Sequence, residues 1–357
     1  MISSPADAPG AQSGAAGTNL AVVVHGVGDL RVEQRPARTP EPHETVVRIA
    51  YGGVCGSDLH YVAEGKAGES ILRAPMVLGH EVVGTVEVAA ADGSGPVAGT
   101  RVAVHPGGSV DPGASYPAGR PNLSSAATYL GSAARVPHVD GAFVQHLTIA
   151  SSMLRVVPDA VPLRAAALAE PASVAWHAVR QAGDVRGRRV LVVGCGPIGL
   201  LTVAVLRRAG AGHITVTDVH ASALQRAIAL GADRGVLAAE REAVAALGVD
   251  LAFESSGSPH GFTAAVGAST GGAVLVLVGL LPPGDVSVPL APAITKELQI
   301  RGSFRFVDEM GDVLAALADG SLRVDEVITH EYPVAEAGEA FDVARDAAAS
   351  GKVLLRF

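Results

Sequence analysis

Residues 189–218 read RVLVVGCGPIGLLTVAVLRRAGAGHITVTD, and this stretch decides the fold. It contains an apolar strand pattern, the glycine run GCGPIG at 194–199, an apolar helix pattern and a second strand pattern that ends at Asp218. A bare GxGxxG is weak evidence. Here the run lies between a strand and a helix, and an acid follows 19 residues after its last glycine, which is typical of a dinucleotide-binding unit.

This stretch predicts a binding site for a dinucleotide cofactor. The glycines allow a tight turn and close approach of a pyrophosphate, while the helix N-terminus faces the phosphate charge. Asp218 is placed to accept hydrogen bonds from ribose hydroxyls and would repel a 2′-phosphate, so we expect NAD rather than NADP. His220 and Arg226 leave room for partial tolerance of NADP. The alternative is a glycine-rich turn in an ordinary α/β unit. The expected cofactor-binding residues are Gly194, Gly196, Pro197, Ile198, Gly199 and Asp218.

Alternating helix and strand patterns continue on the C-terminal side and predict a parallel, doubly wound sheet. The expected elements are a helix at 224–230, strands at 250–254, 273–279 and 298–302, helices near 308–318 and 335–349, and a terminal strand at 352–357. On the N-terminal side the chain is rich in β patterns broken by glycine and proline. The expected strands are 20–24, 30–33, 44–51, 82–88 and 101–104.

A second informative stretch, 52–84, holds one of the two cysteines, Cys55, and the tripeptide Gly79-His80-Glu81. A thiolate, an imidazole and a carboxylate together bind zinc and leave one position open for water or substrate. The alternative is a small buried thiol and two surface polar residues. Asp58 and His60 lie close enough in sequence to support the ligands by hydrogen bonds.

The segments GGVCGSDLHY (52–61) and APMVLGHEVVG (74–84) resemble the zinc-dependent medium-chain dehydrogenases, on their sorbitol (polyol) dehydrogenase branch. The resemblance runs over nearly the whole chain from about Leu20. It implies a β-rich GroES-like catalytic domain, formed by 18–171 and 305–357, and a Rossmann NAD-binding domain at 172–304. Residues 1–17 are expected to form a disordered tail, without the basic start and apolar core of a secretory signal.

The resemblance also implies roles for individual residues. Cys55, His80 and Glu81 match metal-site positions, and Glu170 matches a glutamate that binds zinc directly or through water. Zinc would act as a Lewis acid on the substrate hydroxyl, and a hydride would pass from the carbinol carbon to the nicotinamide. Asp58 is expected to orient His80.

Four further residues carry alternatives beside their implied roles. Ser57 and His60 match a proton relay to solvent, since histidine titrates near neutral pH; a turn cap and a water-facing side chain are the alternatives. Tyr61 and Arg305 match substrate-pocket positions; a packing role for Tyr61 and a surface ion pair for Arg305 are the alternatives.

Residues 107–124 depart from the family. Relatives commonly carry four cysteines here, spaced C-x2-C-x2-C-x7-C, that hold a structural zinc. The matching positions in this chain are Val110, Gly113, Tyr116 and Ser124. None is a thiolate, so we expect one catalytic zinc per chain and no structural zinc. The loop should then be held by packing alone or be mobile.

Two arginines and three runs of sequence bear on the substrate. The runs 131–141, 74–79 and 301–306 resemble bacterial L-idonate 5-dehydrogenases more than sorbitol dehydrogenases, which implies oxidation of the C5 hydroxyl of L-idonate to 5-keto-D-gluconate. Arg305 is the first candidate to grip the carboxylate and Arg135 a weaker one. A sorbitol or xylitol dehydrogenase, a zinc-free quinone or enone reductase on the same fold, and a noncatalytic NAD-binding sensor are the alternatives.

The composition indicates which partners and which cellular compartment to expect. The 357 residues are 48% hydrophobic and 17% charged, which suits two folded domains. A net charge of −8 argues against nucleic acid as a main partner. No apolar run reaches the roughly 18 residues of a membrane helix. Two cysteines form no disulfide framework, so a cytoplasmic protein is expected. A small sugar acid or polyol is the expected partner, together with copies of the same chain in a dimer or tetramer.

Overall fold

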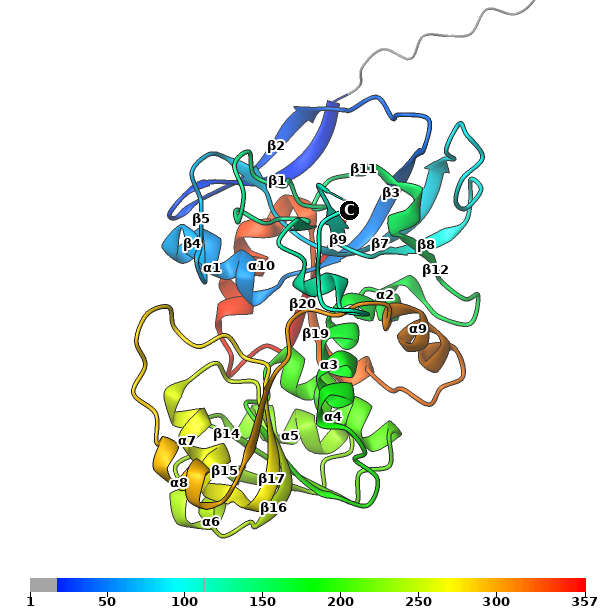
Figure 1. Ribbon diagram of the computed structural model, residues 1–357. Coiled ribbons are helices and arrows are strands. Elements are labelled where there is room, and N and C mark those ends of the chain that lie inside the picture. The colour runs from blue at the N-terminus through cyan, green and yellow to red at the C-terminus, as the bar shows by residue number, and fades with distance from the viewer. Residues whose placement is uncertain (1–17, 112) are drawn as a thin grey trace, which may run out of the picture.

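The computed structural model describes residues 18–111 and 113–357, which fold into two parts, each built on a large sheet (Figure 1). The tail expected at 1–17 lies outside the described residues. One part, green to yellow in Figure 1, contains the stretch that carries the glycine run. The other part, blue to cyan, contains Cys55 and His80, and the red C-terminal strand joins it.

The sheet around the glycine run is parallel throughout. Within the described residues its strand order is β15-β14-β13-β16-β17-β18. These strands are β13 (Arg189–Val193), β14 (His213–Asp218), β15 (Arg234–Leu237), β16 (Val249–Glu254), β17 (Ser269–Leu277) and β18 (Gln299–Gly302). The intervening helices are α4 (Pro197–Arg208), α5 (Ala221–Ala229), α6 (Arg241–Ala245), α7 (Pro259–Ala268) and α8 (Leu290–Thr295). The expected doubly wound fold is confirmed, although the sequence patterns missed β15.

The central strand β13 shows why this sheet is covered on both faces. Its residues alternate between two apolar clusters: Val190 and Val192 belong to one, and Leu191 and Val193 to the other. A strand buried on both sides reads as a continuous apolar run, as this one does. Strand order reverses between β13 and β16, so the carboxyl ends of these two strands form the crevice where such sheets bind ligands.

The second large sheet is mixed and contains the C-terminal strand of the chain. Among the described residues its order is β12-β8-β7-β3-β20-β19, with β11 also paired to β3. The strands are β3 (Glu44–Gly53), β7 (Glu81–Val88), β8 (Arg101–Val104), β11 (His146–Ala150), β12 (Leu154–Val156), β19 (Ile328–Pro333) and β20 (Lys352–Arg356). Because β20 pairs with β3, the C-terminal strand lies directly beside residues 51–53.

Smaller elements complete the fold. The strands are β1 (Thr18–Gly26), β2 (Asp29–Pro36), β4 (Lys66–Ala67), β5 (Ser70–Ile71), β6 (Met76–Val77), β9 (Gly107–Ser109) and β10 (Ala127–Tyr129). The α-helices are α1 (Gly56–Glu64), α2 (Leu163–Ala166), α3 (Ala169–Ala182), α9 (Met310–Ala318) and α10 (Ala337–Arg345). Single 3₁₀ turns lie at Pro121–Leu123, Ser151–Met153, Asp325–Val327 and Val334–Glu336.

The cysteine-free loop is ordered by hydrogen bonds. Strands β9 and β10 pair antiparallel at its two ends. The buried Asn122 donates from Nδ2 to the carbonyl oxygen of Phe304 at 2.7 Å, which ties the loop to the segment after β18. The expectation that packing alone holds this loop is therefore wrong. Backbone pairing and a side-chain amide supply directional bonds that the sequence pattern did not reveal.

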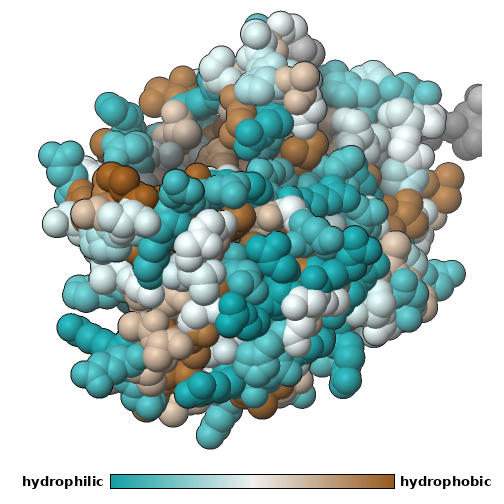
Figure 2. All heavy atoms as spheres, turned by 60° about the horizontal axis from the view of Figure 1, so that its bottom comes forward, coloured by the Kyte–Doolittle hydropathy of each residue, from teal (hydrophilic) through white to brown (hydrophobic). Residues whose placement is uncertain are grey.

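The surface agrees with the composition. The face shown in Figure 2 is mostly hydrophilic, with hydrophobic residues in separate small patches. None of the helices in the described part of the chain combines the length and apolar character that a membrane crossing requires.

Candidate metal and cofactor site

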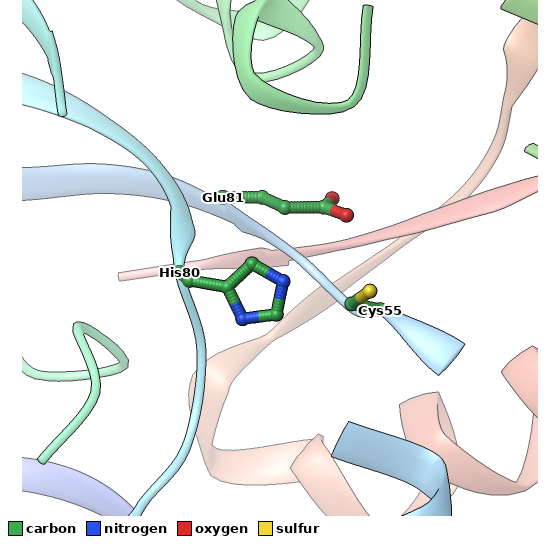
Figure 3. Close-up of side chains that lie close together, drawn as sticks. All are labelled: Cys55, His80 and Glu81. Atoms are coloured by element: carbon green, nitrogen blue, oxygen red, sulfur yellow. The ribbon is translucent and has the colours of Figure 1, made fainter. Parts of the chain in front are cut away.

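Cys55, His80 and Glu81 come together where two neighbouring strands meet. Cys55 caps the N-terminus of α1 just after β3, and His80 and Glu81 stand at the start of β7, which pairs with β3. One donor atom from each residue lies within 4.8 Å of the others. The three side chains point toward one another in Figure 3. Gly53 is opposite Glu81 in the register, and a Cβ there would overlap the Glu81 carboxylate, so glycine is required for this approach.

Lys352 is a residue of this site that the sequence reasoning missed. Its Nζ donates to both carboxylate oxygens of Glu81, at 2.7 and 2.6 Å, and to the Val54 carbonyl oxygen at 3.0 Å. Lys352 and Glu81 are 2% and 1% exposed, so the pair is shielded from water. Burial alone would lower the pKa of Lys352, but Glu81 and Cys55 raise it. The only signal in the sequence is one lysine at the start of the apolar run KVLL.

Asp58 supports the site through the backbone. Its carboxylate, fully buried, accepts hydrogen bonds from the Cys55 N–H at 3.0 Å and the Gly79 N–H at 3.1 Å. Burial raises the pKa of Asp58, against the opposing effect of His80. Within the described residues Asp58 makes no hydrogen bond to the His80 ring, so it fixes the two chain segments and not the imidazole itself.

Glu170 lies in the first turn of α3, and its carboxylate accepts a hydrogen bond from the hydroxyl of Tyr129. Glu170 is 5% exposed and is not a member of the Cys55–His80–Glu81 group. Burial, together with the Glu81 charge, raises the pKa of Glu170 to about 7, although His80 and Tyr129 oppose this. Tyr129 is the second residue that sequence reasoning missed, because nothing in the run ATYLG marks it as part of a site.

Arg305 lies beside this cluster in an unusual backbone conformation, with φ of 55°. Its guanidinium carbon is 4.1 Å from the centroid of the Tyr129 ring and 4.7 Å from that of Phe304. Burial lowers the pKa of Arg305, although Tyr129 and Glu170 counteract this. No residue in the described ranges forms a hydrogen bond or ion pair with its guanidinium. Arg135, by contrast, donates to the carbonyl oxygens of Ser125 and Ala127, so it is committed to its own loop.

The remaining expected site residues lie at different depths. Tyr61 is 2% exposed, and its hydroxyl accepts a hydrogen bond from the Ala133 N–H at 2.9 Å, contacts that favour the packing alternative. The side chain of His60 is 60% exposed and bonds Glu64 at 2.9 Å, one helical turn away. Ser57 is half-buried, and the described residues show no hydrogen bond between Ser57 and His60.

The cofactor residues gather at the carboxyl end of the parallel sheet. Gly194 has φ of 88°, and a Cβ on Gly199 would overlap the Gly194 carbonyl oxygen, so both positions require glycine. Gly196 faces open space, where Pro197 and Ile198 begin α4. Asp218 accepts hydrogen bonds from the Cys195 N–H at 2.7 Å and the His220 N–H at 2.9 Å. Its carboxylate therefore lies directly against the glycine loop.

The charges around Cys55 fit a bound zinc ion. Thiol, imidazole and carboxylate are the donors that zinc prefers, and three protein ligands leave a position for substrate. Burial would lower the pKa of His80, but the neighbouring Cys55, Asp58 and Glu170 raise it well above its ordinary value. The Nδ1 atom of His80 is buried and has no hydrogen-bond partner among the described residues.

Comparison with known proteins decides the family. Residues 41–159 match the alcohol dehydrogenase GroES-like domain, and residues 197–319 match the zinc-binding dehydrogenase domain. Sorbitol dehydrogenase of Gallus gallus is 37% identical over 340 residues, which cover 93% of this chain and 94% of the relative. This protein belongs to the zinc-dependent medium-chain dehydrogenases.

Two solved structures of this family extend the comparison. L-Idonate 5-dehydrogenase from Escherichia coli K-12 has a TM-score of 0.88 at 34% identity, covering 95% of this chain and 98% of that one. A zinc-binding dehydrogenase from Sinorhizobium meliloti 1021, bound to NADP, has a TM-score of 0.85 at 26% identity and covers 96% and 100%. This medium-chain dehydrogenase is thus a zinc- and nicotinamide-dependent oxidoreductase of the polyol type.

Proposed function

We propose that this dehydrogenase oxidises a secondary hydroxyl of a sugar acid, with L-idonate as substrate and 5-keto-D-gluconate as product. The observation that carries the proposal is the guanidinium of Arg305, which lies beside Tyr129 and Glu170 and forms no hydrogen bond or ion pair within the described residues. A partly buried guanidinium whose hydrogen-bond donors have no acceptor among the described residues favours an anionic group on the substrate, and arginine can hold a carboxylate through two hydrogen bonds. The similarity to E. coli L-idonate 5-dehydrogenase supports the same substrate class.

The roles of the chain's own residues follow from their positions. Cys55, His80 and Glu81 hold the zinc, with Glu170 nearby, and Asp58 fixes the backbone on which Cys55 and His80 stand. When bound, zinc acts as a Lewis acid on the substrate hydroxyl. Ser57 and the exposed His60 conduct the released proton to solvent through intervening groups. Arg305 orients the acid end of the substrate.

A neutral polyol such as sorbitol or xylitol is the second candidate, favoured by the similarity to sorbitol dehydrogenases. The test compares kcat/KM for L-idonate, sorbitol and xylitol, with Arg305→Gln beside the unsubstituted enzyme. We expect L-idonate to be preferred and the substitution to reduce the L-idonate value more than the polyol values. If the neutral polyols win by tenfold or more, about 1.4 kcal/mol of transition-state binding, the sugar-acid proposal is wrong.

NAD is the proposed cofactor. Asp218 places a carboxylate at the ribose position, where it repels a 2′-phosphate. Arg226, the nearest candidate to bind such a phosphate, donates instead to the carbonyl oxygens of Ala347 and Ser350 at 3.2 and 3.1 Å. The S. meliloti relative shows that this fold also accepts NADP. Equal or better kcat/KM with NADP would overturn the proposal.

The same proposal includes the organisation of the protein. The catalytic part comprises 18–171 and 305–357 and the NAD-binding part 172–304, as the return of β19 and β20 to the sheet of β3 supports.

One zinc is bound per chain, because residues 107–124 contain no cysteine. Elemental analysis giving two tightly bound zinc ions per chain contradicts this point. Two free cysteines support a cytoplasmic location.

We include a homo-oligomer, dimer or tetramer, in the proposal. Leu280, Leu290, Ile294 and Ile300, all between β17 and the end of β18, are large apolar residues with 40–74% exposure. Such a group around the edge strand of a sheet is typical of an interface. Light scattering combined with gel filtration measures the assembly directly, and a monomer at micromolar concentration contradicts it.

A further inference from the structure

Glu81 and Glu170, two of the carboxylates near His80, are held in different ways. Glu81 lies in the three-residue metal group and is matched by the ammonium of Lys352. Glu170 lies outside that group, and its partner is the uncharged hydroxyl of Tyr129. A buried carboxylate beside a metal site would be stabilised by turning toward the cation. The hydrogen bond from Tyr129, which holds Glu170 in another position, therefore affects which residues can bind the metal.

The ring of Tyr129 is fixed on two sides. Its edge meets the His80 ring at a centroid distance of 5.5 Å and an interplanar angle of 61°. The Arg305 guanidinium stacks on it at 4.1 Å. The backbone is fixed as well, because Tyr129 pairs with Gly107 in the β9–β10 ladder. These contacts leave the hydroxyl aimed at Glu170.

We propose that Tyr129 is a positioning residue that keeps Glu170 out of the zinc ligand set, so that Cys55, His80 and Glu81 are the protein ligands. This inference rests on the proposed zinc site. Tyr129 acts on the metal only through Glu170, and it links that carboxylate to Arg305, the proposed substrate-binding cation. Strand β10, which follows the cysteine-free loop, thereby contributes a residue to the site.

The experiment measures metal coordination and metal affinity in the full-length protein. Tyr129→Phe removes the hydroxyl and keeps the ring that contacts His80 and Arg305. The readouts are the visible absorption of the Co²⁺-substituted protein, which reports the number and type of ligands, and the zinc Kd from competition with a chelator. Tyr116→Phe is the matched control, since Tyr116 lies on the loop that precedes β10, is 44% exposed and has no hydrogen bond from its hydroxyl among the described residues.

We expect Tyr129→Phe to change the Co²⁺ spectrum and to tighten zinc binding by about tenfold, the size typical of changes at residues that support a ligand. Glu170→Gln alone should leave the spectrum unchanged. The double variant Tyr129→Phe/Glu170→Gln should return to the unsubstituted spectrum, because no carboxylate is left to join the metal.

Three results would overturn the inference. An unchanged spectrum and Kd in Tyr129→Phe assign Tyr129 to packing alone. A changed spectrum that persists in the double variant shows that Tyr129 acts by another route. A changed spectrum in Glu170→Gln alone shows that Glu170 is already a ligand, and this reading does not depend on how well Tyr129→Phe folds. If the unsubstituted protein binds neither zinc nor Co²⁺, the proposed function fails together with this inference. If it binds metal and the variants give one of the three results above, only the inference about Tyr129 fails.

Discussion

Two strand-to-helix turns form the candidate metal site and the candidate cofactor site, and they contain different kinds of residue. At the end of β3, Cys55 begins α1 beside buried charged side chains, and each of these charges has a partner or faces the metal position. At the end of β13, the turn into α4 is rich in glycine, and backbone groups, serine side chains and the Asp218 carboxylate lie against it. The first turn offers side chains to a ligand, whereas the second offers backbone groups.

This difference predicts that the two turns respond to different kinds of substitution. Removing the partner of a buried charge lowers the free energy of unfolding by several kcal/mol, whereas replacing the whole ion pair by apolar residues of comparable shape is tolerated. A glycine turn is insensitive to charge but does not accept a Cβ where another chain segment lies against it. The four predictions below test this contrast, from the largest expected effect to the smallest.

The two cysteines give the largest expected contrast. Cys55→Ala should lose bound zinc and turnover, by more than the ~100-fold that follows loss of a residue supporting a ligand, with the fold intact. Cys195→Ala is the control: Cys195 is 1% exposed in the glycine turn, and burial raises the pKa of its thiol, so it remains an uncharged filler. Zinc content, circular dichroism and turnover measure both. Retained zinc in Cys55→Ala would contradict the assignment.

Lys352→Met should destabilise the metal-free protein by about 3–5 kcal/mol, because it leaves the Glu81 carboxylate buried without a counterion. Urea unfolding in the presence of a chelator measures this. The double variant Lys352→Met/Glu81→Gln removes both charges and should recover much of the loss. A single variant as stable as the unsubstituted protein would show that the pair is not shielded from water.

Gly199→Ala should cost up to about 3 kcal/mol of stability, since the new Cβ would overlap the Gly194 carbonyl oxygen. Gly196→Ala is the matched control, because no atom lies within 4 Å of its Cβ position. We expect Gly196→Ala to keep the thermal midpoint and to weaken NAD binding, as its methyl occupies space for the pyrophosphate. Equal thermal midpoints for the two variants would contradict the difference in packing.

Glu309 tests a buried carboxylate outside both turns. It accepts a hydrogen bond from Nδ1 of His177 at 2.7 Å, and both residues are buried. Burial would raise the pKa of Glu309, but the hydrogen bonds from His177 and the Val307 N–H lower it from 4.5 to about 2. Its stabilisation is therefore complete above pH 4.5 and is lost as the pH falls toward 2.

Glu309→Gln should lower the free energy of unfolding by about 2 kcal/mol at pH 7. The difference from the unsubstituted protein should shrink between pH 4.5 and 2, as measured by urea unfolding at each pH. A difference that stays constant over that range would show that the carboxylate's charge contributes nothing.

Much of the fold was predictable because local patterns coincide with tertiary burial. The run 189–193 is apolar at four consecutive positions, and the structure buries all four, on alternating faces. Short strands were missed: β15 reads RGVL, and its second residue is a glycine with low strand propensity, so only pairing with β14 makes it a strand.

The sequence by itself determined the metal group and the glycine turn, because their residues lie within a few positions of one another or in a recognisable spacing. Only the tertiary structure decided their partners. Lys352 reaches Glu81 across 271 residues because β20 inserts beside β3, and Tyr129 reaches Glu170 across 41 residues because β10 pairs with β9. Partners of this kind are chosen by strand pairing in space, and the free energy that drives the pairing comes from burial of whole elements, which leaves no local mark at either residue.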